Sequence, residues 1–421
     1  MRPPATTPRA LAGRCIAVLT LAATLPLTAC GHSPSAHWNG TDGSSGNTDD
    51  GGKVTVTISA PADGAQNVPA AIEIAYKTTN AKGAATVQLT DASGTAIDGA
   101  PRADGSTWLP AQSLKYATRY TAKVTATGND GKPATSSVSF TTMAAPGSTS
   151  HMISNMGDSQ VYGIGAPVVL TFTKAIPQEA RAAVQRRLFV QSTPAQEGAW
   201  SWFSDKEVHF RPKDFWQVGT KVSLKALFRG VPLGNGSFGD DDLTIDASIV
   251  TSALRIDVDD KTKVLTVTQD GKVIKSIPAS LGKASTPSSS GNMVIMTRAD
   301  QEIFDSSTNG VPANGPGGYR ETVFYPLRLT WDGQYIHAAP WSTSAQGSYD
   351  VSHGCTNISM DDAKWLYGIV HIGDPVTVKN TGAPLSWTDG WTDWDRGFDD
   401  FVKGSAIPYA PTAPTPAPSG S

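Results

Sequence analysis

One stretch of the sequence combines a thiol, an imidazole and a glycine. It is Ser352-His353-Gly354-Cys355-Thr356-Asn357, and a second imidazole, His337, lies upstream of it. A cysteine thiolate attacks carbonyl carbon readily, and a nearby imidazole can accept the thiol proton. We therefore interpret Cys355 as a nucleophile, and the rest of the chain as the means of holding it and delivering it to a substrate.

The cysteine content supports a reactive thiol. The chain has three cysteines. Cys15 lies in an apolar stretch near the start, and Cys30 ends Leu27-Thr28-Ala29-Cys30, which resembles the lipobox of bacterial lipoproteins. Cys355 is then left without a disulfide partner. An unpaired thiol is a liability in an oxidising compartment, which favours a functional role over that of a buried small hydrophobe.

Residues 1–29 predict a lipoprotein signal peptide. Arg2, Arg9 and Arg14 precede an apolar run that is too short for a membrane-spanning helix, which makes a degenerate membrane anchor the weaker alternative. Cleavage would leave 31 basic and 37 acidic residues, a formal charge of −6. That balance does not favour nucleic acid as a partner. We expect an extracytoplasmic protein held to the outer face of the cell membrane by lipid on Cys30.

The next part of the chain predicts a tether followed by two β-domains. Residues 30–52, with the lipidated cysteine at their start, are rich in Gly, Ser, Asp and Asn and predict a flexible linker. From Lys53 onward, short alternating segments are separated by turn residues, and the pattern repeats at a fixed offset. We predict two tandem immunoglobulin-like sandwiches, at 53–146 and 148–250, acting as spacers. His151 and His209 in them have no evident companion ligands.

The third unit, at 252–379, predicts a β-meander with a long loop and one helix. The loop at 305–320 is rich in Gly, Pro, Asn and Ser, which is typical of a lid or binding loop. Ser359 is placed to cap a helix that follows the cysteine motif directly. Residues 380–408 predict a short helical, Trp-rich subdomain packed on this unit, and 409–421 a Pro-rich disordered tail. The expected fold class is mainly β throughout.

Residues 252–379 resemble the catalytic domain of the L,D-transpeptidases, the YkuD-like family. The family signature is a His followed by Ser/Thr-His-Gly-Cys-x-Asn, and His337 with Ser352-His353-Gly354-Cys355-Thr356-Asn357 matches it in order and spacing. The lipobox, tandem immunoglobulin-like domains and Trp-rich tail resemble the mycobacterial and related actinobacterial members. Papain-like peptidases place the cysteine before the histidine, and sortases need an arginine soon after the thiol, so neither matches.

The resemblance implies roles for individual residues. Cys355 is the nucleophile, and His337 is a general base that forms an ion pair with it, held through its second nitrogen by the carbonyl of Ala338. His353 shapes the thiol loop, and the amides around Gly354-Cys355-Thr356 are the oxyanion donors. The residues implied in substrate binding are Tyr319, Asp332, Gly333, Trp341, Ser352, Thr356 and Asn357.

The resemblance also implies a reaction. Cys355 would attack the third residue of a peptidoglycan tetrapeptide stem, release D-alanine, and pass the acyl group to a second stem as a 3→3 cross-link. The alternatives are an L,D-carboxypeptidase and a non-enzymatic cell-wall-binding lipoprotein. No metal or cofactor is implied, and β-lactams of the carbapenem type are expected to acylate Cys355.

Overall fold

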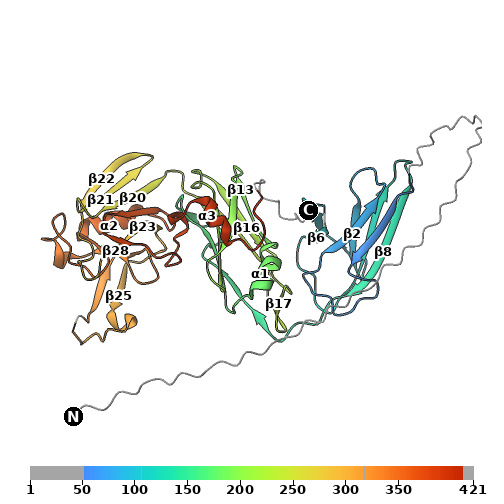
Figure 1. Cartoon of the computed structure of the whole chain (residues 1–421), viewed down its shortest axis with the longest axis horizontal. Helices are drawn as coiled ribbons and strands as arrows, with labels where there is room; N and C mark the ends of the chain where they lie inside the picture. The colour runs from blue at the N-terminus through green and yellow to red at the C-terminus, as the bar shows by residue number, and fades with distance from the viewer. Residues whose placement is uncertain (1–51, 106, 317, 411–421) are drawn as a thin grey trace, which may run out of the picture. The chain divides into compact units, whose positions relative to one another are not determined.

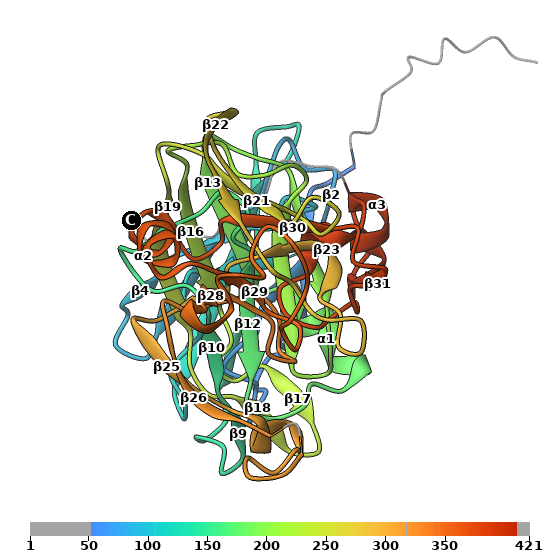
Figure 2. The same ribbon diagram turned by 90° about the vertical axis from the view of Figure 1, so that its left-hand side faces the viewer.

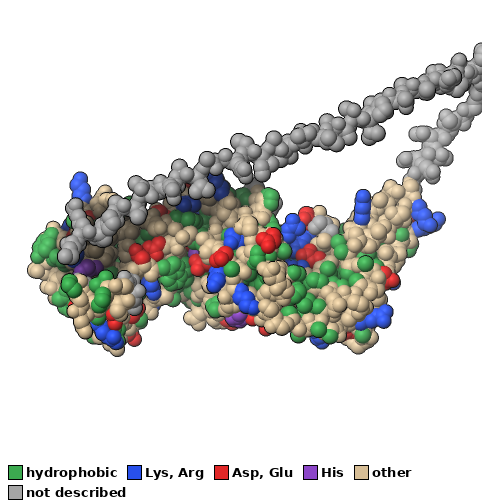
Figure 3. Space-filling model, turned by 60° about the horizontal axis from the view of Figure 1, so that its bottom comes forward, with side chains coloured by type: hydrophobic (Ala, Val, Ile, Leu, Met, Phe, Trp, Pro, Cys, Tyr) green, Lys and Arg blue, Asp and Glu red, His purple; other side chains and the backbone are tan. Residues whose placement is uncertain are grey.

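The structure is a computed structural model that describes residues 52–105, 107–316 and 318–410. The predicted signal peptide, Cys30, nearly all of the linker and most of the Pro-rich tail lie outside these residues. No helix within the described part of the chain is long and apolar enough to cross a membrane. On the face seen in Figure 3, acidic and basic side chains are interspersed.

The first sandwich is built from two four-stranded sheets. One has the order β1 (Thr55–Ala60), β2 (Ile74–Thr79), β6 (Thr107–Pro110), β5 (Gly99–Pro101). The other has the order β4 (Ala96–Ile97), β3 (Thr86–Asp91), β7 (Arg119–Thr127), β8 (Pro133–Thr141). Every second residue of β7 from Tyr120 to Ala126 is buried, because successive side chains of a strand point to opposite faces.

The second sandwich repeats this plan. Its sheets have the orders β10 (Met152–Ser154), β12 (Val168–Phe172), β15 (Glu207–Pro212), β14 (Gly198–Trp202) and β11 (Val161–Tyr162), β19 (Leu243–Ile249), β16 (Lys221–Ala226), β13 (Leu188–Thr193). A small sheet of β17 (Pro232–Gly234), β18 (Ser237–Gly239) and β9 (Thr149–Ser150), with helix α1 (Gln178–Gln185), completes it. Trp200, Trp202 and Trp216 are buried in the core.

The third unit holds the cysteine motif (Figure 1). A six-stranded sheet has the order β22 (Lys272–Pro278), β21 (Val264–Gln269), β20 (Leu254–Asp259), β30 (Pro375–Lys379), β23 (Ser289–Val294), β31 (Ala383–Pro384). A four-stranded sheet has the order β24 (Thr297–Arg298), β27 (Leu327–Arg328), β28 (Tyr335–Ala338), β29 (Thr356–Ile358). The predicted meander is confirmed as β20–β22. The mainly β fold class is confirmed across the described residues.

The segment predicted as a lid or binding loop lies at the end of a hairpin. Strands β25 (Gln301–Asp305) and β26 (Arg320–Phe324) pair antiparallel, and the two lie side by side in Figure 2. Between them is a short 3₁₀ turn, η1 (Ser306–Asn309), capped by the Asp305 side chain. The Phe304 ring of β25 contacts the Tyr335 ring of β28 at 4.5 Å, so one face of the hairpin packs on the sheet that contains β28.

Helix α2 (Met360–Ile369) begins where the sequence predicts. The Ser359 hydroxyl accepts a hydrogen bond from the Asp362 amide at 3.1 Å, and Leu366 is buried. The expectation that this helix follows the thiol loop directly is wrong, because strand β29 comes between them. The Cys355 loop therefore leads into a sheet.

The Trp-rich segment packs on the third unit and also on the second sandwich. It forms η3 (Asp393–Asp395), α3 (Phe398–Phe401) and η4 (Val402–Gly404). Trp391 clusters with Val294 and Met296 of the third unit, and the Asn292 amide donates to the Asp395 carboxylate at 2.8 Å. The Trp394 ring lies 4.5 Å below the Arg211 guanidinium, and Trp387 lies 4.5 Å from the Phe203 ring. The contacts with the second sandwich were not predicted, because an apolar stripe does not specify which apolar surface it will cover.

His209 is correspondingly not isolated. Its Nδ1 lies 3.0 Å from the Asp393 carboxylate and its Nε2 lies 2.7 Å from Glu207, with the ring fully buried. His151 contacts Asp240 at 2.7 Å. Asp393 and Asp240 lie too far along the chain for sequence spacing to reveal them, whereas Glu207 is only two residues from His209 on β15.

Candidate active site

The pairing of β28 with β29 brings the thiol and the imidazole together. The two strands are parallel, with Ile336 opposite Thr356 and His337 opposite Asn357. Because side chains alternate along a strand, the paired residues His337 and Asn357 point to one face of the sheet. Cys355 lies two residues before Asn357 and is therefore directed to the same face.

Cys355 and His337 line one cavity of about 400 Å³. Its wall consists of Tyr319, Glu321, His337, Trp341, Ser342, Ser344, Ala345, Tyr349, Val351, Ser352, His353, Cys355 and Asn357. The hairpin contributes the first two of these residues, and the cysteine motif contributes Ser352, His353, Cys355 and Asn357. Candidate nucleophile and base therefore share a site that a peptide can enter.

Two serines fix the backbone of the thiol loop. The Ser352 hydroxyl accepts from the Gly354 amide at 3.1 Å and donates to the Cys355 carbonyl at 2.6 Å. The buried Ser288 hydroxyl donates to the Gly354 carbonyl at 2.7 Å and accepts from the Gly282 amide at 3.0 Å. Gly354 has φ +124°, a conformation that residues with a Cβ rarely adopt. The loop is therefore held from both sides.

This hydrogen bonding decides which amide is available to an oxyanion. The Gly354 amide is occupied by Ser352, so it is not a donor, contrary to expectation. The Gly354 carbonyl points to Ser288, and in a trans peptide the Cys355 N–H points the opposite way. Among the described residues the Cys355 amide has no acceptor. It is the oxyanion donor that the geometry leaves free.

His337 is buried and neutral. Its Nδ1–H donates to the Ala338 carbonyl at 2.9 Å, which is the expected contact, and this fixes Nε2 as the basic nitrogen. Burial lowers the His337 pKa from 6.5 to about 4, although the Ala338 contact acts in the opposite direction. The Phe304 ring contacts the imidazole edge-on at 5.5 Å, and Trp341 lies 6.1 Å away. The imidazole is therefore positioned to accept a proton.

The thiol is neutral as well. The Cys355 Sγ donates to the Gly333 carbonyl at 3.7 Å. Burial raises the Cys355 pKa from 9.0 to about 12, against a smaller lowering by a backbone hydrogen bond from Tyr335. Burial therefore disfavours the charged form of both partners in the expected ion pair between Cys355 and His337.

His353 lies beside a lysine. Its Nε2 accepts from the Lys283 ammonium at 2.9 Å, and the Tyr319 ring lies 5.7 Å away. Burial and the Lys283 charge lower the His353 pKa. An imidazole whose Nε2 is already accepting a hydrogen bond is better placed to shape the loop than to act as the primary base.

The remaining candidates are divided between the cavity and its surroundings. Tyr319, Trp341, Ser352 and Asn357 line the cavity, whereas Asp332, Gly333 and Thr356 do not. The Asn357 amide donates to the Ser342 hydroxyl at 3.1 Å, and its Oδ1 is buried without a partner among the described residues. The Asp332 carboxylate accepts from the Thr330 hydroxyl. Gly333 contributes only its carbonyl, the acceptor of the thiol.

Sequence reasoning missed several residues of the site. Ser288 lies far upstream of the motif, and nothing in its local sequence signals its contact with the thiol loop. The cavity-lining residues that were not predicted are Glu321, Ser342, Ser344, Ala345, Tyr349 and Val351. Of these, Glu321 follows the predicted Tyr319 by two positions. Residues two apart in an extended segment point to the same face, so the prediction of Tyr319 could have been extended to Glu321.

Comparison with known proteins identifies relatives along most of the chain. Residues 253–378 match the L,D-transpeptidase catalytic domain (YkuD), and residues 65–232 match a bacterial Ig domain. L,D-transpeptidase 2 of Mycobacterium tuberculosis is 37% identical over 360 residues, covering 84% of this chain and 85% of the relative. L,D-transpeptidase 5 of the same species is 33% identical over 339 residues, covering 79% and 72%.

Among solved structures, the matches span a shorter part of the chain. A structure of L,D-transpeptidase 3 from Mycobacterium tuberculosis with a faropenem-derived adduct is 32% identical, covers 54% of this chain and 97% of that chain, and has a TM-score of 0.46. The match in sequence to the curated relatives extends across both the Ig region and the catalytic domain. The chain therefore belongs to the L,D-transpeptidase family and is an L,D-transpeptidase with an Ig region ahead of its catalytic domain.

Proposed function

We propose that this L,D-transpeptidase forms 3→3 cross-links between peptidoglycan stems through a thioester on Cys355. The observation that carries the proposal is the shared cavity, in which the Cys355 thiol and the basic Nε2 of His337 face one space. A neutral thiol next to a neutral imidazole is competent for acyl transfer, since the proton moves as the bond forms.

The first half-reaction releases D-alanine. The substrate displaces the contact between Sγ and the Gly333 carbonyl, and Sγ attacks the carbonyl of the third stem residue, a diamino acid. The thiol proton passes to Nε2 of His337, and the Cys355 N–H donates to the oxyanion. When the tetrahedral intermediate collapses, the imidazolium returns its proton to the leaving amine of D-alanine. The acyl group remains on sulfur as a thioester.

The second half-reaction uses the same groups in reverse. The side-chain amine of a second stem attacks the thioester carbonyl and loses its proton to His337. Collapse of the intermediate expels Sγ, which recovers the proton. Water in place of the amine gives a tripeptide, the product of an L,D-carboxypeptidase.

The proposed location of the reaction is outside the cell membrane. The support is sequence alone: the basic and apolar pattern of residues 1–29, and Leu27-Thr28-Ala29-Cys30 as the attachment site for lipid. The Gly- and Ser-rich segment after Cys30 would let the enzyme reach stems in the wall. Metabolic labelling with a fatty acid, in wild type and in Cys30→Ala, tests the anchor. Labelling of both proteins, or of neither, would contradict it.

The reaction is tested with the chain from Lys53 onward and a purified disaccharide-tetrapeptide, beside Cys355→Ala. Intact mass should show cross-linked dimer and loss of D-alanine for wild type alone. Tripeptide alone would establish the carboxypeptidase, and the absence of any thioester would favour a binding protein on this fold. A carbapenem should add its full mass to wild type and nothing to Cys355→Ala.

A further inference from the structure

Glu321 is the charged side chain of the catalytic cavity. Of the residues in the cavity wall, it alone carries a charge at neutral pH, because burial keeps Cys355 and His337 neutral and lowers the pKa of His353. Glu321 lies on β26, at the exposed rim of the cavity, next to Tyr319 of the same hairpin. A peptide that reaches Cys355 therefore passes a carboxylate.

The Glu321 carboxylate has no cation or hydrogen-bond donor among the described residues. The adjacent Arg320 does not neutralise it, because Arg320 is on the other side of the strand and pairs with Asp305 at 3.1 Å. The Glu321 carboxylate interacts electrostatically with two other residues of the cavity wall. It acts to raise the His353 pKa against burial and Lys283, and it adds to burial and Cys355 in raising the Tyr319 pKa.

An unpaired carboxylate at this position opposes the reaction unless a cation joins it. Negative charge develops on sulfur and on the oxyanion during acyl transfer, and a neighbouring anion disfavours both. A positively charged substrate group at Glu321 would cancel that effect and would gain a charge-assisted contact. The ammonium of a diamino acid is such a group, and it is present in both stems of the proposed reaction.

We propose that Glu321 is a specificity-determining residue that binds the side-chain ammonium of the diamino acid in a stem peptide. The proposal rests on the proposed function, which supplies the diamino acid. The ammonium belongs either to the donor stem, bound during thioester formation, or to the acceptor stem, bound before capture. The chemistry at Glu321 is the same in both cases, and separate measurements distinguish them.

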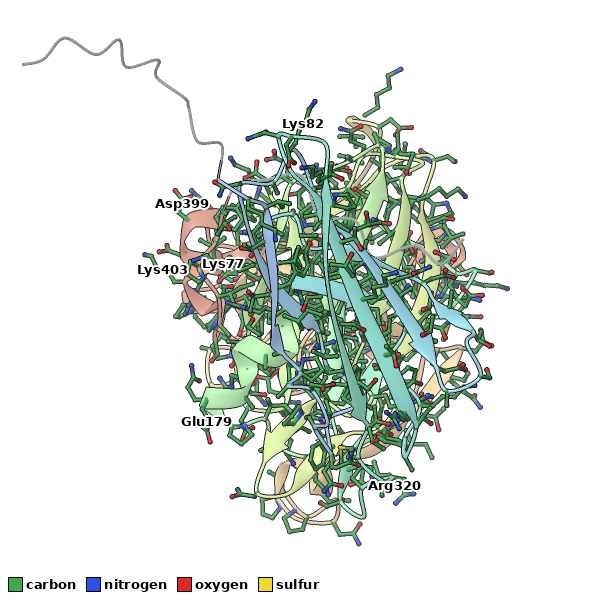
Figure 4. All side chains as sticks on the ribbon, turned by 90° about the vertical axis from the view of Figure 1, so that its right-hand side faces the viewer. Lys77, Lys82, Glu179, Arg320, Asp399 and Lys403 are labelled. Carbon is green, nitrogen blue, oxygen red and sulfur yellow. The ribbon has the colours of Figure 1, made fainter. Side chains whose placement is uncertain are left out.

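The test compares Glu321→Gln with wild type, using stems whose side-chain amine is either free or N-acetylated. Glu179→Gln is the matched control, since Glu179 lies on the outer side of α1 in the second sandwich, as Figure 4 shows. The donor measurement is the rate of thioester formation against stem concentration, by intact mass, without acceptor. The acceptor measurement is the rate at which a free-amine stem captures a thioester that was formed from an acetylated donor.

We expect Glu321→Gln to lower kcat/KM about three- to fivefold in one of the two measurements, as for an exposed ion pair. In the donor measurement the loss should appear with the free amine alone. In either measurement it should shrink at high salt, and Glu179→Gln should match wild type. The affected measurement identifies the stem. Equal rates for Glu321→Gln and wild type in both measurements, or an equal loss with free and acetylated stems, would overturn the proposal.

A binding measurement separates this inference from the proposed function. Absence of thioester in wild type with every stem would refute the proposed function by itself. In that event, calorimetry with Cys355→Ala and a free-amine tetrapeptide still tests Glu321. The inference survives only if Cys355→Ala prefers the free amine to the acetylated peptide, and if adding Glu321→Gln removes that preference.

Discussion

The protonation state of the resting thiol leads to a quantitative prediction. Burial raises the Cys355 pKa to about 12 from an ordinary 9.0, so the thiolate fraction at pH 7 falls about a thousandfold below that of a free thiol. A more basic thiolate is intrinsically more nucleophilic, which offsets about twentyfold of that loss. Reaction of Cys355 with a small neutral electrophile should therefore be roughly fiftyfold slower than that of an unfolded cysteine at pH 7.

The assay is alkylation by iodoacetamide from pH 6 to pH 10, followed by intact mass. The chain from Lys53 onward contains Cys355 as its single cysteine, so the same protein in denaturant supplies the free-thiol reference. The folded rate should rise about tenfold per pH unit up to pH 10, whereas the unfolded rate should level off above pH 9. The slope separates ionisation from simple steric protection, which lowers the rate without changing its pH dependence.

A preformed ion pair between Cys355 and His337 gives the opposite result. The thiolate would then be present throughout the interval between the two pKa values, and the folded rate would be flat from about pH 5 to pH 8. A flat profile, with a rate above that of the unfolded chain, would refute the argument from burial. A variant His337→Gln should keep the steep profile, because the resting imidazole carries no charge that could stabilise a thiolate.

Three further predictions concern the supports of the site. Ser288→Ala leaves two buried backbone groups unpaired, the Gly354 carbonyl of the thiol loop and the Gly282 amide. It should lower the free energy of unfolding by about 2–4 kcal/mol, measured by denaturation, and slow thioester formation more than tenfold, measured by intact mass. Unchanged acylation would contradict the role assigned to Ser288. Burial alone would lower the His209 pKa, but the Asp393 charge and hydrogen bonds to both carboxylates raise it to about 9. Its stabilisation is therefore complete below about pH 6.5 and lost as the pH rises through 9, and the free energy of unfolding should fall by roughly 3 kcal/mol from pH 7 to pH 10. The double variant His209→Gln, Asp393→Asn should not show that fall, and an equal fall in both proteins would count against the pair. Gly163→Ala places a Cβ 2.3 Å from the backbone of the catalytic domain and should lower the melting temperature by several degrees, whereas Gly147→Ala, with no atom within 4 Å, should not; similar melting temperatures would mean that the contact relaxes without cost.

The sequence by itself determined the chemistry of this protein. Cys355 and His337 are recognisable because a lone thiol, a glycine and two imidazoles in that order have few other uses. The local structure of single elements was also determined, since alternation along β7 and the cap at Ser359 are decided by neighbours in the chain. These features depend on interactions within a few residues, which a linear pattern records.

Tertiary structure alone decided how that chemistry is arranged. The register of β28 against β29 puts thiol and imidazole on one face, and burial then favours the neutral form of both, whereas the family resemblance implied an ion pair. Ser288, just before β23, and Glu321, on β26, reach the site from distant segments, and the Trp-rich segment packs on both the second sandwich and the catalytic domain. Strand pairing, burial and charge compensation depend on contacts between segments that are distant in the sequence. A local pattern of residues does not specify the free energy of those contacts.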